Sequence, residues 1–182
     1  MPRPSIEHLR GLGDLSTNYQ WNLNFVTFPI AVTLAGRFPK GEDLNKRCIS
    51  TTLPKKSTGR LTANIRGYQV NQPGTLQYNE SIQLEFIETV DNVVSLFLLA
   101  WHELCSRTGT QIHWPKDMLE SIIQIERLDR QDNPIWLYVL YGCFLMDYEH
   151  GELNSSNGLL QPKITITYDY FKEQPLGSLV SF

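Results

Sequence analysis

Alternation of apolar and polar residues predicts β-strands along most of the chain. Residues 19–30 place Trp21, Leu23 and Phe25 on one face and asparagines on the other, which is typical of a strand with one buried face. The alternation is most regular over residues 75–88. Its apolar positions are Leu76, Tyr78, Ile82, Leu84 and Phe86, and its polar positions are Gln77, Asn79, Ser81, Gln83 and Glu85. We expect one face of this strand to be wet.

A projecting hairpin is predicted between these two strands, at about residues 47–71. Residues 47–53 are rich in β-branched side chains and stop at Pro54, which has no N–H for a strand ladder, and residues 60–71 alternate again. The polar residues 55–59 between them predict the loop at its tip. Basic residues gather in this hairpin, namely Lys55, Lys56, Arg60 and Arg66. Glycine and proline predict a loop at 36–47 before the hairpin and a turn at 71–74 after it.

One long helix is predicted at about residues 91–106. Its residues from Val93 to Cys105 are apolar around most of the circumference, and Thr89 or Asp91 can cap its first turn. An apolar helix of this kind packs on a sheet, and its remaining apolar surface favours contact with a neighbouring subunit. The residues that we predict for that contact are Leu96, Leu99, Trp101 and His102.

The second half of the chain predicts three more strands. A turn-rich stretch at 108–116 precedes a strand in the later part of 118–128, and a polar turn at 129–134 precedes the almost wholly apolar run 135–145, typical of a strand buried on both faces. Residues 163–171 alternate again. We expect an N-terminal arm at 1–18, one domain at 19–172 and a C-terminal tail at 173–182.

Composition supports a single folded domain. The chain has 182 residues, of which 41% are hydrophobic, enough for a real core. It has neither an apolar run of about 18 residues nor a signal-like start, so we expect a soluble protein made in the cytoplasm. Its three cysteines cannot all pair with one another and predict reduced, mostly buried thiols.

Charge divides the chain into a basic and an acidic part. Residues 1–66 hold 10 Lys/Arg and 4 Asp/Glu, a net charge of +6, whereas residues 67–182 hold 6 and 15, a net charge of −9. Such a division suits a nucleic-acid patch, and it suits equally a subunit whose basic surface docks on the acidic surface of its own copy.

The sequence contains no complete catalytic or cofactor motif. His102-Glu103 resembles half of a zinc site, but Ser106 stands where the second histidine is needed, and a packed helix is the favoured interpretation. Phosphate-binding glycine loops and the G-x-S-x-G nucleophile motif are absent. Tyr68 among the basic hairpin residues is a weak signal for nucleic acid, because basic loop residues usually form a solvated face. We therefore expect no enzyme activity, no cofactor and no metal site.

The order of these elements resembles that of the tail tube proteins of contractile-tailed (T4-like) bacteriophages. Three segments carry the resemblance: Cys48 to Pro54 leading into the hairpin, Thr75 to Phe86 leading into the helix with Trp101, and the closing Ile164 to Phe171. The likeness runs from about Tyr19 to Lys172. A related baseplate protein that initiates the tube shares the pattern and stays open as an alternative.

The resemblance implies an α+β, mainly β, fold with a β-sandwich or barrel-like arrangement of antiparallel strands. It implies homohexameric rings stacked head to tail into a hollow tube that conducts DNA during ejection, with sheath and baseplate partners in the virion tail. The polar side of strand 75–88 would then face the lumen, where few cations would hold DNA. A basic hairpin tip could meet an acidic rim on the next ring.

Two other classes of function stay open. A tube of similar fold in a phage-tail-like secretion or injection machine would also form rings, and only its attached machinery would distinguish it. A monomeric binding module or enzyme predicts instead a deep pocket lined by side chains with perturbed pKa values.

Overall fold

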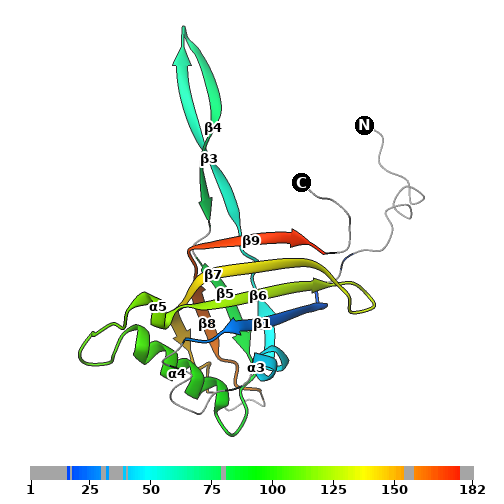
Figure 1. Cartoon of the computed structure of the whole chain (residues 1–182), viewed down its shortest axis with the longest axis vertical. Coiled ribbons are helices and arrows are strands. Elements are labelled where there is room, and N and C mark those ends of the chain that lie inside the picture. The colour runs from blue at the N-terminus through cyan, green and yellow to red at the C-terminus, as the bar shows by residue number, and fades with distance from the viewer. Residues whose placement is uncertain are drawn as a thin grey trace.

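We describe the fold from a computed structural model in which residues 16, 18–29, 32, 39, 41–78, 81–153 and 158–176 are described. Nearly all of the predicted arm at 1–18, and residues 177–182 of the predicted tail, lie outside the described residues. The described part is a body of antiparallel strands with helices at one end and a long two-stranded hairpin projecting from the other (Figure 1). The predicted α+β, mainly β, fold is confirmed.

The body is one seven-stranded sheet that folds over on itself. Its order is β1-β6-β7-β8-β5-β2, with β9 also paired to β7. One half contains β1 (Trp21–Thr27), β6 (Ser121–Leu128), the first part of β7 (Pro134–Glu149) and β9 (Tyr170–Pro175). The other half contains the last part of β7 with β8 (Lys163–Thr167), β5 (Ser81–Phe86) and β2 (Cys48–Thr51). Among the described residues β1 and β2 do not pair with each other, so the sheet stays open.

The hydrophobic core lies between the two halves of this sheet. Leu23 and Phe25 of β1 and Ile123 and Ile125 of β6 enter it from one half. From the other half the alternating apolar residues enter: Ile82, Leu84, Phe86, Ile164 and Ile166. The predicted alternation of residues 82–86 is therefore confirmed, because Ile82, Leu84 and Phe86 are each at most 1% exposed.

Strand β7 belongs to both halves because it changes partner at Gly142. Residues 136–141 pair with β9, whereas residues 144–149 pair with β8. Gly142 has φ of 68°, a left-handed conformation that other residues adopt at a cost. A Cβ at this position would also collide with the carboxylate of Asp169, which lies in the break between β8 and β9. The predicted last strand, 163–171, is therefore two strands.

Helix α4 (Val93–Cys105) closes one end of the core. Val94, Phe97, Leu98 and Trp101 are buried, and the Trp101 indole N–H donates a hydrogen bond of 3.1 Å to the carbonyl of Leu119. Leu119 ends the short helix α5 (Lys116–Leu119). The predicted loop at 36–47 contains instead a third helix, α3 (Gly41–Arg47), which buries Leu44 beside β1.

A carboxylate outside the helix caps α4. Glu88 accepts hydrogen bonds from the backbone N–H groups of Thr89 (3.0 Å), Val94 (3.2 Å) and Ser95 (2.6 Å), and from the Ser95 hydroxyl (2.6 Å). Burial raises the pKa of Glu88, but the bonds from Ser95, Thr89 and Val94 outweigh it, so that the pKa lies below its ordinary value. The predicted cap, Thr89 or Asp91, is wrong, because the N-cap position is Asn92 with no side-chain cap bond.

The projecting hairpin is formed by β3 (Lys56–Ile65) and β4 (Tyr68–Tyr78), which we call the arm. It projects as predicted (Figure 1), but its position in the chain differs. The turn is Arg66-Gly67, not residues 55–59, and residues 48–51 pair with β5 in the body. The predicted turn at 71–74 lies inside β4, where the pairing register shifts opposite Gly59. Residues 75–78 belong to the arm, so the predicted strand 75–88 is divided.

Replacing Glu88 by glutamine tests the cap. The folded-state pKa is lowered, so the ionised form stabilises the fold above the ordinary glutamate pKa, and this stabilisation is lost as the pH falls through the folded-state value. We expect Glu88→Gln to lower the free energy of unfolding by about 1–2 kcal/mol at pH 7 and by much less in acid. Urea unfolding at both pH values measures this, with the exposed Glu152→Gln as control. An equal loss at both pH values would contradict the cap.

Replacing Gly142 by alanine tests the change of partner in β7. The left-handed backbone alone costs about 1–2 kcal/mol, and the collision with Asp169 adds to it. Gly158→Ala is the matched control, because nothing lies within 4 Å of its added Cβ. Thermal unfolding at equal protein concentration should show a lower Tm for Gly142→Ala alone. Equal Tm values for the two variants would mean that Gly142 is dispensable.

Candidate assembly interface

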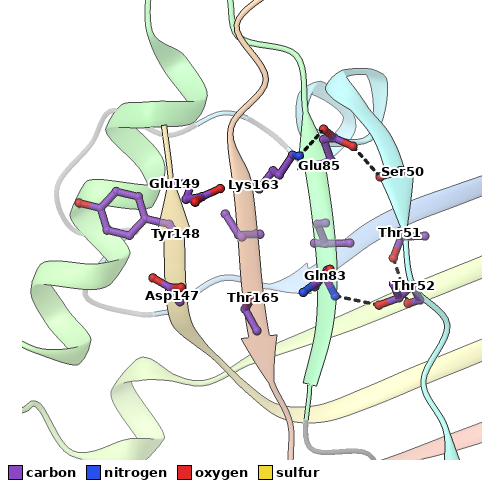
Figure 2. A pocket seen from close by; sticks show the side chains of 12 residues that line it. Ser50, Thr51, Thr52, Gln83, Glu85, Asp147, Tyr148, Glu149, Lys163 and Thr165 are labelled. Carbon is purple, nitrogen blue, oxygen red and sulfur yellow. Dashed lines mark hydrogen bonds and ion pairs between the residues drawn. The ribbon is translucent and has the colours of Figure 1, made fainter. Parts of the chain in front are cut away.

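The outer face of strands β2, β5, β8 and the last part of β7 is polar. Because Ile82, Leu84 and Phe86 point into the core, Gln83 and Glu85 point away from it. Register places Gln83 opposite Thr165 and Glu85 opposite Lys163 on β8. This polar face, shown in Figure 2, holds an open hollow of about 500 Å³.

Acidic groups outnumber basic ones on the polar face. Three carboxylates line its hollow, those of Glu85, Asp147 and Glu149, against the single ammonium of Lys163. Lys163 Nζ lies 3.4 Å from the Glu85 carboxylate, which also accepts a hydrogen bond of 3.1 Å from the Ser50 hydroxyl (Figure 2). The one lysine of the hollow is thus paired within the chain.

The residues predicted to face a lumen are only partly brought together. Ser81, Gln83 and Glu85 share β5 and alternate with its buried residues, whereas Gln77 lies on the arm and Asn79 lies outside the described residues. Four residues that were not predicted to face a lumen join the polar face from other strands: Asp147, Glu149, Lys163 and Thr165. The alternation of residues 163–167 was a signal for Thr165, but only the pairing shows which strand lies beside which.

The outward face of α4 exposes two of the four predicted contact residues. Leu96 is 51% exposed and Leu99 is 43% exposed. Trp101 is completely buried in its own core, so its assignment to a contact between subunits is wrong. His102 is partly buried, with its ring 5.1 Å from that of Tyr148. Leu96 and Leu99 are therefore the residues of this set that are most open to a partner.

The arm has one apolar and one polar face. Its register pairs Leu61 with Gln72, Ala63 with Val70 and Ile65 with Tyr68, and cross-strand partners lie on the same face. The residues of this apolar face are Leu61, Ala63, Ile65, Tyr68 and Val70. The other face carries Arg60, Thr62, Asn64, Gln69 and Asn71.

The predicted cluster of basic residues at the tip of the arm is spread out along it. Arg66 alone is in the turn, with φ of 49°. Lys56 lies at the base, where it forms an ion pair with Glu173 and lies 5.8 Å from the centre of the Phe171 ring. Lys55 precedes the arm, and Arg60 lies within it opposite Pro73.

A second hollow, of about 420 Å³, lies between α4, α5 and β7, and we call it the α4–α5 hollow. Its apolar lining includes Trp114, Leu119, Phe144, Leu145 and Met146, of which Trp114 is 46% and Met146 is 56% exposed. None of its described lining residues carries a carboxylate. Lys116 lines it too, in an ion pair with Asp169.

The partial zinc motif makes other contacts in the described structure. Glu103 accepts hydrogen bonds from Thr108, and His113 Nδ1 donates one of 2.6 Å to the carbonyl of Cys105, so the partial zinc motif is used otherwise. No group of three metal-ligating side chains occurs in the described part of the chain. All three cysteines are free, and burial raises their pKa values, to about 12 for Cys48 and Cys143 and about 11 for Cys105. No helix among the described residues is long and apolar enough to cross a membrane.

Solved structures share this fold at low sequence identity. A chain of the anti-feeding prophage baseplate has 13% identity and a TM-score of 0.64, with 90% of this chain and 97% of that chain covered. The tube-terminating cap of the same prophage has 12% identity and a TM-score of 0.64, with 91% of this chain and 94% of that chain covered. A chain from the sheath-tube complex of an extracellular contractile injection system, in its extended state, has 13% identity and a TM-score of 0.63. The match covers 95% of this chain and 99% of that chain.

Sequence comparison identifies the family. No curated protein matches the chain significantly. The family profile described as phage tail tube protein matches residues 15–174, which include the described helices and strands of the body and the arm except for the last residue of β9. The chain therefore belongs to the phage tail tube protein family, as its order of strands and helix indicated.

Proposed function

We propose that this protein is the structural subunit of a phage tail tube, forming stacked hexameric rings whose lumen conducts DNA during ejection. The observation that carries the proposal is the polar, acidic face of β2, β5, β8 and β7, set directly against a core closed by α4. A sheet that lines a tube needs one face buried in the core of the subunit and one polar face toward the solvent of the lumen, and this sheet has both. Such a subunit works by assembly and not by catalysis.

The open edge of β2 suits closure into a ring. Among the described residues β2 pairs only with β5 and leaves its other backbone edge unpaired, whereas the outer edge of β1 meets α3, where the Leu23 N–H donates a hydrogen bond of 2.8 Å to Asn45 Oδ1. Exposed edges invite pairing with another chain, and closure of a ring of subunits removes them. Residues Ser81, Gln83 and Glu85 would then line the lumen together with Thr165 and Lys163.

The charge on the polar face suits passage of DNA without binding. Cationic side chains supply the contacts that hold phosphate. Here the only lysine of the hollow, Lys163, is paired with Glu85, and Asp147 and Glu149 add negative charge. DNA in such a lumen would be repelled weakly from every side.

The remaining exposed surfaces suit contacts between subunits and with the tail. The Leu96 and Leu99 side chains on α4 would pack on the neighbouring subunit in the ring, with the partly buried His102 at its margin. The arm, with Arg60 and Arg66, would reach the next ring, and Lys55 and Lys56 would support its base. Sheath and baseplate proteins would be further partners in the virion tail, after synthesis in the host cytoplasm.

Two related functions fit the same fold. A baseplate protein that initiates the tube is one, and the tube subunit of a phage-tail-like injection machine is the other. The observation that favours them is the fold likeness to the baseplate and sheath-tube structures, over at least 90% of this chain. In both of them the ring and the arm keep the roles proposed above.

Electron microscopy of the purified protein, with light scattering for mass, tests the proposal. We expect six-fold rings or hollow tubes from the unmodified chain. Leu96→Asp combined with Leu99→Asp should leave a folded particle near 21.0 kDa, because two buried charges oppose the ring contact. The matched control is Leu153→Asp, at a position that is 92% exposed.

Two results would count against the proposal. An unmodified protein that stays at the subunit mass at every concentration contradicts ring formation. Normal rings from the α4 double variant would show that its exposed leucines contact something other than the neighbouring subunit. Far-ultraviolet circular dichroism of each variant establishes that the body is folded.

A further inference from the structure

We propose that the apolar face of the arm seats in the α4–α5 hollow of a second copy of the chain, in the next ring of the stack. This inference rests on the proposed function and deepens it, because it names both surfaces of the contact between rings. It differs from an ionic contact between a basic tip and an acidic rim, since the side chains that bind are uncharged.

The first observation is the exposure of the arm's apolar face. Tyr68 is 77% exposed, Leu61 is 61% exposed and Ile65 is 56% exposed, although all three lie on one side of a two-stranded ladder. A contiguous apolar surface rimmed by polar residues marks a site of protein contact. An isolated two-stranded hairpin is also marginally stable in water, so a partner for this face would stabilise the arm itself.

The second observation is that the base of the arm is fixed to the body. Lys56 forms its ion pair with Glu173 on β9, and the Tyr78 ring lies 5.6 Å from that of Phe171. Further out, Gly59 and Gly74 face each other so closely that a Cβ on Gly74 would lie 3.0 Å from the Gly59 carbonyl. The strands cross between the base and the tip (Figure 1). These contacts fix the base of the arm against β9.

The third observation is the chemistry of the α4–α5 hollow. Its volume, about 420 Å³, lies within the range of pockets that bury small ligands, and aromatic and aliphatic side chains dominate its lining. Without a carboxylate in its lining, the hollow offers nothing to Arg66, and its lysine is already paired with Asp169. An aromatic ring and its aliphatic neighbours, such as Tyr68 with Ile65, match this lining.

The relative positions of the two surfaces indicate a second copy as the partner. The arm leaves the body beside β9 and points away from it, whereas α4 and α5 lie lower in the same view (Figure 1). A projection and a hollow at different places on one chain make a heterologous contact, which repeats along an axis instead of closing on itself. That is the contact needed to stack one ring on another.

Cysteine cross-linking tests this contact directly. We expect the double variant Tyr68→Cys, Met146→Cys, treated with a short bis-maleimide, to give a ladder of covalent dimers, trimers and longer species on a denaturing gel. The matched control is Asn71→Cys with Met146→Cys, which moves the arm thiol to the polar face. The native Cys105 thiol in the hollow reacts slowly, because burial raises its pKa to about 11.

The outcomes separate this inference from the proposed function. A ladder from the Tyr68 pair but not from the Asn71 pair supports the docking. Tubes that are visible by electron microscopy, with no ladder or with a stronger one from the Asn71 pair, overturn the docking and leave the tube function standing. In a Cys105→Ser background, covalent dimers from Tyr68→Cys alone would show that two arms pack on each other, which also overturns it. An unmodified protein that forms neither rings nor tubes contradicts the proposed function itself.

Discussion

The structure depends on β7 pairing first with one half of the sheet and then with the other. Residues 136–141 pair with β9, and residues 144–149 pair with β8. Gly142 lies between them in a left-handed conformation, and its missing side chain leaves room for the Asp169 carboxylate. This change of partner turns a single antiparallel sheet over a core. It also leaves the outer edge of β2 open to pairing with another subunit, whereas α3 covers part of the edge of β1.

The division between the buried face and the polar face of strands β5 and β8 follows from that geometry. Once β7 turns, Ile82, Leu84 and Ile164 face the core that α4 closes, and the residues between them must face outward. Glu85 and Lys163 meet there as an ion pair. A surface salt bridge of this kind adds little stability, so its main consequence is to neutralise the one cation of the polar face.

The sequence predicts this fold where a segment alternates regularly or is apolar over most of its length. Residues 82–86, the apolar run of β7 and helix α4 are clear in this way, and so is the projection of a hairpin. The position of the hairpin was wrong because Pro73-Gly74 has the composition of a turn, yet it occupies a register shift within β4 opposite Gly59. The pairing of Glu85 with Lys163 and the capping of α4 by Glu88 escaped prediction, because both depend on contacts that local periodicity does not encode.

Cryo-electron microscopy of the assembled protein would show whether the polar face of β2, β5, β8 and β7 lines the lumen of a ring-based tube. We expect Gln83, Glu85 and Lys163 to point toward the axis in every subunit. A reconstruction with this face on the outer wall, or an assembly without a central channel, would contradict this expectation.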